Sequence, residues 1–87
     1  MTIDVLYFAW IKEKVGTGQE QVSPPESVVT VNDLIDWLTG QSASHASAFE
    51  DRDRVRAAVN QTHVSFETPI KDAQEVAFFP PVTGGGT

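Results

Sequence analysis

The sequence predicts an α+β domain in which a mixed sheet packs against one main amphipathic helix. Short segments rich in β-branched and aromatic residues lie near both ends of the chain, as is typical of strands. A helical pattern of apolar residues lies between them. With 87 residues, 40% of them apolar and 21% charged, the chain is expected to form a single domain with a modest core.

The first elements are expected to be a strand, a short helix and a second strand. Residues 3–8 alternate in a way that favours a strand. Residues 9–16 can form two helical turns that end at Gly16, because glycine is the residue that most often follows a helix C-terminus. Residues 18–25 are expected to form a short polar strand that ends at a pair of prolines.

The clearest helix is predicted between Thr30 and Gly40. Thr30 suits an N-cap, and Asp33 follows three residues later, at the spacing of a capping box. The apolar side chains of this segment share one helical face, as in a helix packed on a core. They are Val31, Leu34, Ile35 and Leu38.

The second half of the chain is expected to be mainly β. Residues 41–53 are small, polar and rich in serine, and are predicted to be a loop that can include one helical turn. A strand or bent hairpin at 55–66, a turn region at 67–74 and a final strand at 75–81 follow. If the last strand returns beside the first, the result is a β-grasp (ubiquitin-like) arrangement.

Strand alternation assigns the apolar residues of this sheet to two faces. Phe8 and Phe79 are expected to point away from the helix, together with Leu6 and Ala77, and to form an apolar patch that no second helix covers. The face toward the helix is expected to carry Ile3, Val5, Val55, Ala57, Val59, Val76 and Phe78.

Composition and charge exclude several classes of function. The net charge of −6 argues against nucleic-acid binding, which depends on Lys and Arg. No signal peptide and no apolar segment of membrane-spanning length are recognised, so the chain is expected to be cytoplasmic.

His45 is interpreted as a residue of a surface loop and His63 as a strand residue, and neither has ligand spacing for a metal. The serines near His45 lack an orienting third group, so no active site is predicted.

The C-terminal part resembles the family of molybdopterin synthase small subunits, which are ubiquitin-like sulfur carriers. The segments that carry the resemblance are "AAVNQT" (57–62) and "VAFFPPVTGG" (76–85), and "VLYFAWIKEKVGT" (5–17) is similar to the family's opening strand and helix. The resemblance implies a β-grasp domain over residues 1–82 and a flexible glycine-rich tail over residues 83–87.

The resemblance also implies what the tail does. In the family, an ATP-dependent activating enzyme adenylates the C-terminal glycine, and a sulfur donor protein converts the acyl-adenylate to a thiocarboxylate. The tail then enters the large subunit, where its sulfur is transferred to cyclic pyranopterin monophosphate, in an assembly of two small and two large subunits. The chain itself is then a non-catalytic, sulfur-donating subunit that binds no cofactor, since the ATP is used by the activating enzyme.

Particular residues match the family's functional positions. Gly85 corresponds to the terminal glycine that carries the sulfur, and glycine suits a narrow channel because it has no Cβ. The tail comprises Thr83, Gly84, Gly85 and Gly86. The positions that correspond to the contact with the large subunit are Phe8, His63, Phe79, Pro80, Pro81 and Val82, and His63 stands where an apolar residue is more usual.

Two questions stay open at this stage. The residues Gly86-Thr87, beyond the family's diglycine end, are left over from cloning, a natural extension that is trimmed, or a tolerated variant end. The other functions to consider are a sulfur carrier for thiamine or another pathway, a plain interaction module, and a ubiquitin-like protein modifier. In the last case Lys12, Lys14 or Lys71 would be chain-forming sites.

Overall fold

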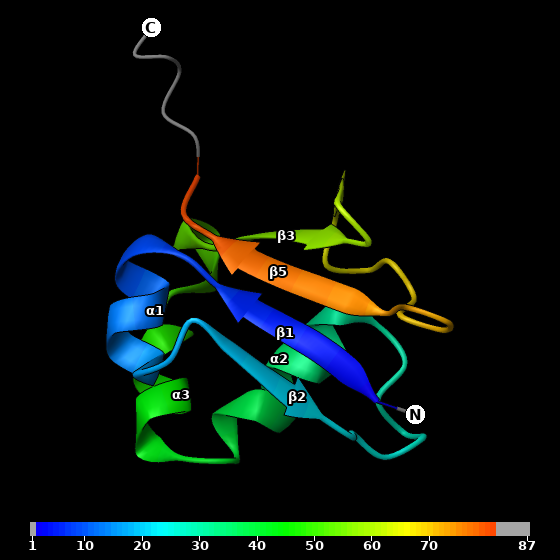
Figure 1. Cartoon of the computed structure of the whole chain (residues 1–87), viewed down its shortest axis with the longest axis horizontal. Coiled ribbons are helices and arrows are strands. Elements are labelled where there is room, and N and C mark those ends of the chain that lie inside the picture. The colour runs from blue at the N-terminus through cyan, green and yellow to red at the C-terminus, as the bar shows by residue number, and fades with distance from the viewer. Residues whose placement is uncertain (1, 82–87) are drawn as a thin grey trace, which may run out of the picture.

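The computed structural model describes residues 2–81, and Figure 1 shows their arrangement. The strands are β1 (Ile3–Tyr7), β2 (Gln19–Val22), β3 (Arg56–Val59), β4 (Thr62–Val64) and β5 (Glu75–Phe79). The helices are α1 (Ala9–Val15), α2 (Val31–Thr39), α3 (Ala43–Ala48) and the short 3₁₀ helix η1 (Arg52–Arg54). No helix within this part of the chain is long and apolar enough to cross a membrane.

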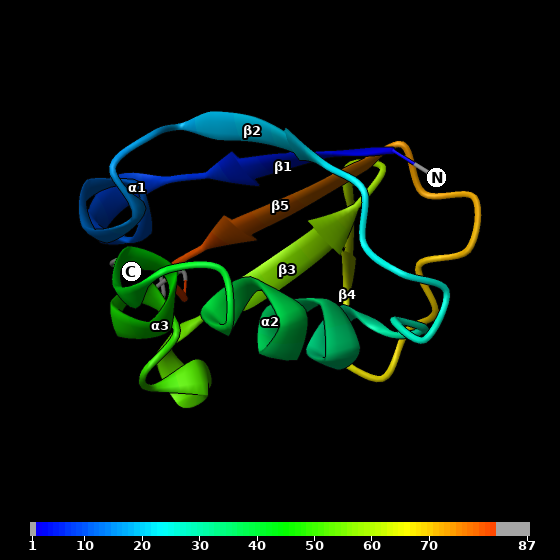
Figure 2. The same ribbon diagram turned by 90° about the horizontal axis from the view of Figure 1, so that it is seen from below.

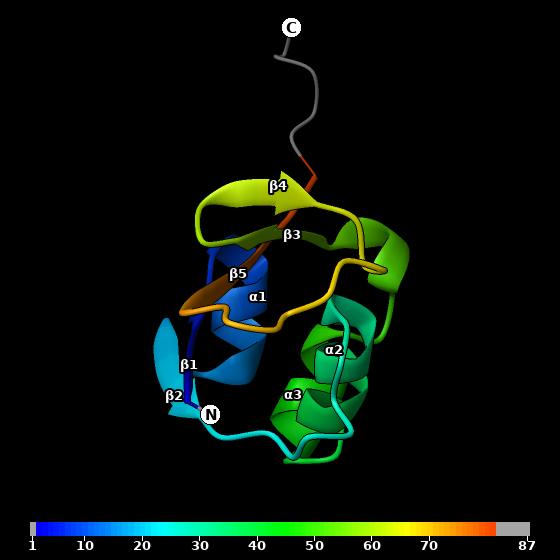
Figure 3. The same ribbon diagram turned by 90° about the vertical axis from the view of Figure 1, so that its right-hand side faces the viewer.

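The strands form one five-stranded mixed sheet in the order β2-β1-β5-β3-β4. The first and last strands, β1 and β5, pair in parallel, and the other neighbours are antiparallel. Figures 2 and 3 show that the helices lie on one side of the strands, with α2 across the sheet and α1 and α3 near the end where β5 finishes. The predicted β-grasp arrangement is confirmed.

Helix α2 forms as predicted because both its start and its apolar face are encoded locally. The Thr30 Oγ1 accepts the backbone N–H of Asp33 (3.1 Å), and the Asp33 carboxylate accepts the N–H of Thr30 (3.2 Å), which completes a capping box. Hydrogen bonds from the backbone N–H groups of Val29 and Thr30 hold the pKa of Asp33 below its usual value. The predicted apolar face is fully buried, and its members are Val31, Leu34, Ile35 and Leu38.

The core lies between α2 and the helix-covered face of the sheet. The predicted inward residues of the sheet belong to one apolar cluster with the α2 face, although Val59 is only half-buried and Val55 lies one residue before β3.

Helix α1 ends at Gly16 as expected. Gly16 has a φ of 99°, a conformation that a residue with a Cβ adopts only at a cost.

The segment 41–53 differs from the loop predicted for it. It forms α3 and most of η1, and Ser42 caps α3 by accepting the N–H of His45 (3.1 Å). Ala48 and Phe49 are buried in the core, and α3 packs against both α1 and α2. The prediction failed because a six-residue helix made of Ala, Ser and His has a weak local signal and forms through its tertiary contacts.

The segment 55–66 contains a hairpin, so the second of its two predicted forms is correct. Asn60 and Gln61 form the two-residue connection between β3 and β4, with φ values of 49° and 72°, as hairpins of this length favour. The Asn60 Oδ1 accepts the backbone N–H groups of Gln74 (2.9 Å) and Glu75 (3.1 Å). One side chain therefore ties the hairpin to the start of β5.

Candidate partner-binding surface beside the tail

The face of the sheet opposite the helices carries a shallow apolar groove. Its floor is a row of register partners across four strands, in which Leu6 pairs with Ala77, Ala77 with Ala58, and Ala58 with His63. The groove encloses about 410 Å³. Its lining is Leu6, Phe8, Ala58, Gln61, His63, Glu75, Ala77 and Phe79.

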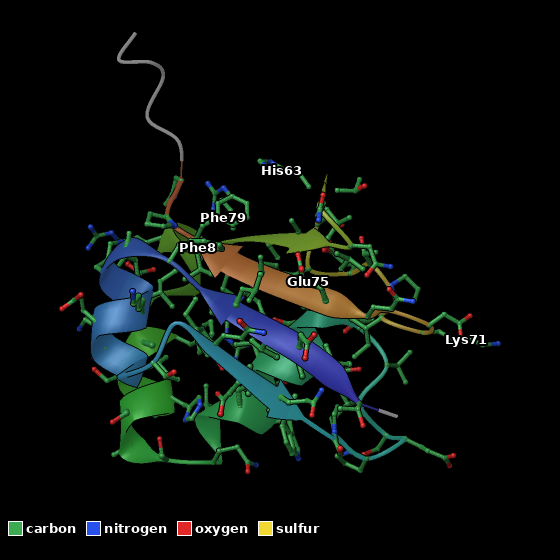
Figure 4. The ribbon with its side chains drawn as sticks, in the orientation of Figure 1. Phe8, His63, Lys71, Glu75 and Phe79 are labelled. Carbon is green, nitrogen blue, oxygen red and sulfur yellow. The ribbon has the colours of Figure 1, made fainter. Side chains whose placement is uncertain are left out.

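Two aromatic side chains form the end of this groove nearest the end of β5. Phe8 is 48% exposed, although phenylalanine is usually buried. Phe79 is half-buried, and its ring lies against that of His63 at 4.9 Å between centroids and 45° between planes. The predicted patch of Phe8 and Phe79 on the uncovered face is therefore confirmed as a structural feature, and Figure 4 shows both residues where the chain leaves the domain.

The backbone around Phe8 explains why its side chain stays on this face. Its N–H donates to the carbonyl of Phe78 (3.1 Å), which continues the ladder of β1 and β5 by one residue. Its own carbonyl accepts the N–H of Ile11 (3.1 Å), so α1 begins immediately afterwards. Ala9 makes the reversal possible with a φ of 54°, which costs an L-residue about 1–2 kcal/mol. Such a conformation beside an exposed aromatic residue is typical of a functional site.

The base of the tail follows directly from β5. Pro80 and Pro81 are half-buried and come after the last strand residue, Phe79. Neither proline has an N–H to extend the sheet, so β5 ends there. Two sets of predicted residues lie outside the described part of the chain. They are the predicted contact residue Val82 and the predicted tail residues Thr83, Gly84, Gly85 and Gly86.

A second polar cluster lies on the helix side, and it corrects the interpretation of His45. His45 belongs to α3, and its side chain is only 12% exposed. The imidazole Nε2 contacts the Glu20 carboxylate at 2.6 Å, and its Nδ1 contacts the Ser42 Oγ at 2.7 Å. The buried Tyr7 hydroxyl donates to the same Glu20 oxygen (2.6 Å). Sequence reasoning missed this cluster because its members come from three separate segments, β1, β2 and the start of α3.

The cluster is better suited to holding α3 than to catalysis. Ser42 already caps α3, so its hydroxyl serves the backbone of that helix. Burial and then the Glu20 carboxylate raise the pKa of Tyr7, which stays a protonated donor. Partial burial raises the pKa of Glu20, but hydrogen bonds from His45 and Tyr7 outweigh it, and the pKa of Glu20 lies below its ordinary value. The cluster therefore links β1, β2 and α3.

Other charged residues near α3 have structural partners. Arg52 donates to the side chains of Asn32 and Asp36 on α2, and the guanidinium of Arg54 lies 5.6 Å from the centre of the Trp10 ring. Among residues 2–81, no three His, Asp or Glu side chains gather closely enough to hold a metal ion. The surface groove and the adjoining tail are thus the best candidates for function.

The fold and the groove define the chain as a β-grasp protein with an uncovered apolar face beside the end of β5. The model of the ThiS family matches residues 5–85, so the chain belongs to the ThiS family. It is 49% identical over 83 residues to the molybdopterin synthase sulfur carrier subunit of Escherichia coli, covering 95% of this chain and 99% of that protein. It is 34% identical over 83 residues to the protein of the same name from Haemophilus influenzae, covering 95% and 99%.

A solved structure shares the fold at lower identity. The crystal structure of small archaeal modifier protein 1 from Haloferax volcanii superposes with a TM-score of 0.72 and 26% identity. The match covers 98% of this chain and 100% of that chain. The resemblance to sulfur carriers noted from the sequence is therefore confirmed at the level of the family.

Proposed function

We propose that this chain is the sulfur carrier subunit of molybdopterin synthase and acts in molybdenum cofactor biosynthesis. The observation that carries the proposal is the 49% identity, over nearly the full length of both chains, to the E. coli protein of that name. The diproline and glycine-rich segment after β5 supports it, because the family model extends through Gly85.

The chemistry of the tail follows from what a carboxylate cannot do unaided. A carboxylate is a poor acyl donor, so its oxygen first attacks the α-phosphorus of ATP and releases pyrophosphate. The resulting acyl-adenylate has a good leaving group, so sulfide (HS⁻) delivered by the donor attacks the carbonyl carbon, the new C–S bond forms as the bond to AMP breaks, and a thiocarboxylate remains. Dividing a difficult transfer into two easier steps is the general logic of covalent catalysis. Gly85 carries the reacting carbonyl in this proposal, once it is the terminal residue.

The proposed partner of the uncovered sheet face is the large subunit of the synthase. A small subunit of this enzyme implies a large one, and the groove provides an apolar surface with aromatic residues at the tail end. Exposed apolar patches of this kind mark binding sites. Phe8, Phe79 and His63 would contact the large subunit while the tail enters its active site. An assembly of two small and two large subunits, the activating enzyme, the sulfur donor protein and a cytoplasmic location belong to the same proposal.

A protein-modifier function is the second candidate, because the archaeal modifier has the same fold. The two candidates differ in sequence support, since that protein is 26% identical and the sulfur carrier is 49% identical to this chain. The lysines considered as chain-forming sites, Lys12, Lys14 and Lys71, are all exposed, as lysines usually are. Their exposure therefore does not favour the modifier.

ATP–pyrophosphate exchange with the activating enzyme tests the proposed role of Gly85. A chain shortened to end at Gly85 is expected to exchange readily, and the 87-residue chain is expected to react poorly because its carboxylate lies two residues farther along. Gly85→Ala in the shortened chain should slow the reaction, because it adds a Cβ beside the reacting carbonyl.

Lys71→Ala is the matched control, since Lys71 lies at the opposite end of the domain from Phe79 (Figure 4). It should react like the parent chain. Equal exchange rates for both lengths and for Gly85→Ala would refute the assignment of Gly85 as the carrier residue.

A further inference from the structure

Histidine is the side chain whose charge changes most readily near neutral pH, and His63 is the one histidine among the described residues that line the groove. It lies on the edge strand β4 and is exposed, and its ring contacts that of Phe79. Within the described chain, no carboxylate lies within ion-pair distance of its imidazole. By contrast, the carboxylate of Glu20 and the hydroxyl of Ser42 engage both ring nitrogens of His45.

The charged groups around His63 do not compensate a positive imidazole. On β5, Glu75 lines the same groove, but it forms no ion pair with His63. On β3, Arg56 is the register partner of Phe79, and its guanidinium donates to the carbonyls of Asp53 and Val55. On β1, Asp4 is the register partner of Glu75. The β4 neighbours Thr62 and Val64 carry no charge.

A partner that covers the groove would enclose His63 with apolar groups. Phe79, Ala58 and the Phe8 side chain provide one wall, and the partner would provide the other. Removing a charged group from water disfavours its charged form, so an enclosed imidazole prefers to be neutral. Binding and proton release are then linked, and the direction of the linkage is fixed: acid favours the free state.

We infer that His63 makes docking of this surface on the large subunit proton-coupled, so that affinity falls as His63 becomes protonated. The inference rests on the proposed function, since that function names the partner. It assigns His63 a role distinct from that of the apolar lining residues. The apolar residues set the strength of docking, and His63 sets its dependence on pH.

Calorimetric titration of the purified large subunit with the full-length chain at several pH values tests the inference. Linked release of one proton is expected to lower affinity about tenfold from about pH 8 to about pH 5.5. The large subunit has titrating groups of its own, so the informative quantity is the difference in slope between the parent chain and His63→Gln. That difference should be about tenfold over this range, with the steeper fall for the parent.

His45→Gln is the matched control, because it removes the other histidine of the chain and leaves the groove unchanged. It should keep the slope of the parent, and a thermal melt of each variant checks that the domain stays folded. Equal slopes for the parent and His63→Gln would overturn the inference. Tighter binding of the parent in acid would also overturn it, because a partner carboxylate would then receive the proton. Absence of binding at every pH would instead refute the proposed function.

Discussion

The two faces of the same sheet differ in how far their side chains are buried. On the helix side, Val5, Tyr7 and Phe78 are at most 1% exposed and pack into the core. On the other side, the alternate positions Leu6 and Phe8 stay partly or largely open to solvent. Because successive side chains on a strand point to opposite faces, adjacent residues lie in different environments. The covered face stabilises the fold, and the uncovered face is available to a partner.

The largest expected effect comes from a substitution in helix α2, which packs against the covered face. Leu34→Ala should lower the free energy of unfolding by about 2–5 kcal/mol, because Leu34 is fully buried and the change leaves a cavity. Small domains have a total stability of about 5–15 kcal/mol, so this loss is a large fraction. Urea denaturation measures it. A midpoint within error of the parent would show that α2 does not contribute to the core as described.

The next largest effect comes from a substitution on the uncovered face that leaves the fold intact. Phe79→Ala should weaken binding to the large subunit by at least about 2 kcal/mol if Phe79 anchors the interface. Its effect on unfolding should be much smaller than that of Leu34→Ala, because Phe79 is already partly exposed. Titration calorimetry and urea denaturation of both variants give the comparison. Unchanged affinity for Phe79→Ala would remove the aromatic patch from the proposed interface.

The smallest effect concerns the polar cluster that holds α3 on the helix side. Glu20→Gln should lower stability at neutral pH by about 1 kcal/mol, because it weakens a charge-assisted pair that is partly exposed. The pKa of Glu20 is lowered in the folded state, so its contribution is present above the ordinary value of 4.5 and is lost as the pH falls below it.

The difference in stability between parent and variant should therefore shrink in acid. Denaturation at neutral and acidic pH tests this, with Glu13→Gln as a control at an exposed residue of α1. A difference that stays constant with pH would contradict the assigned role of the Glu20 carboxylate.

Elements with strong local signals were predictable from the sequence. Helix α2 has its cap in Thr30 and Asp33 and its apolar face within nine residues, so tertiary context adds little to its definition. Strand alternation likewise placed Phe8 and Phe79 on the uncovered face, because the two-residue period fixes direction once the core face is known.

Features that depend on distant contacts were not predictable. Helix α3 forms over Ala43–Ala48 because Ala48 and the neighbouring Phe49 are buried, and the local sequence does not show that. Glu20 and His45 are 25 residues apart and meet only when α3 packs. The resemblance indicated that His63 contacts the partner, but its place in the same groove as Leu6 depends on the pairing of β3 with β4 and β5.

The intact mass of the protein isolated from its native host, as a complex with the large subunit, tests the central claim most directly. The account predicts co-purification with that subunit and a chain that ends at Gly85. A fraction of the chains should be heavier by the difference between one sulfur and one oxygen atom, as a terminal thiocarboxylate requires. A carrier that never gains sulfur, or one found joined to protein lysines through its C-terminus, would contradict the account.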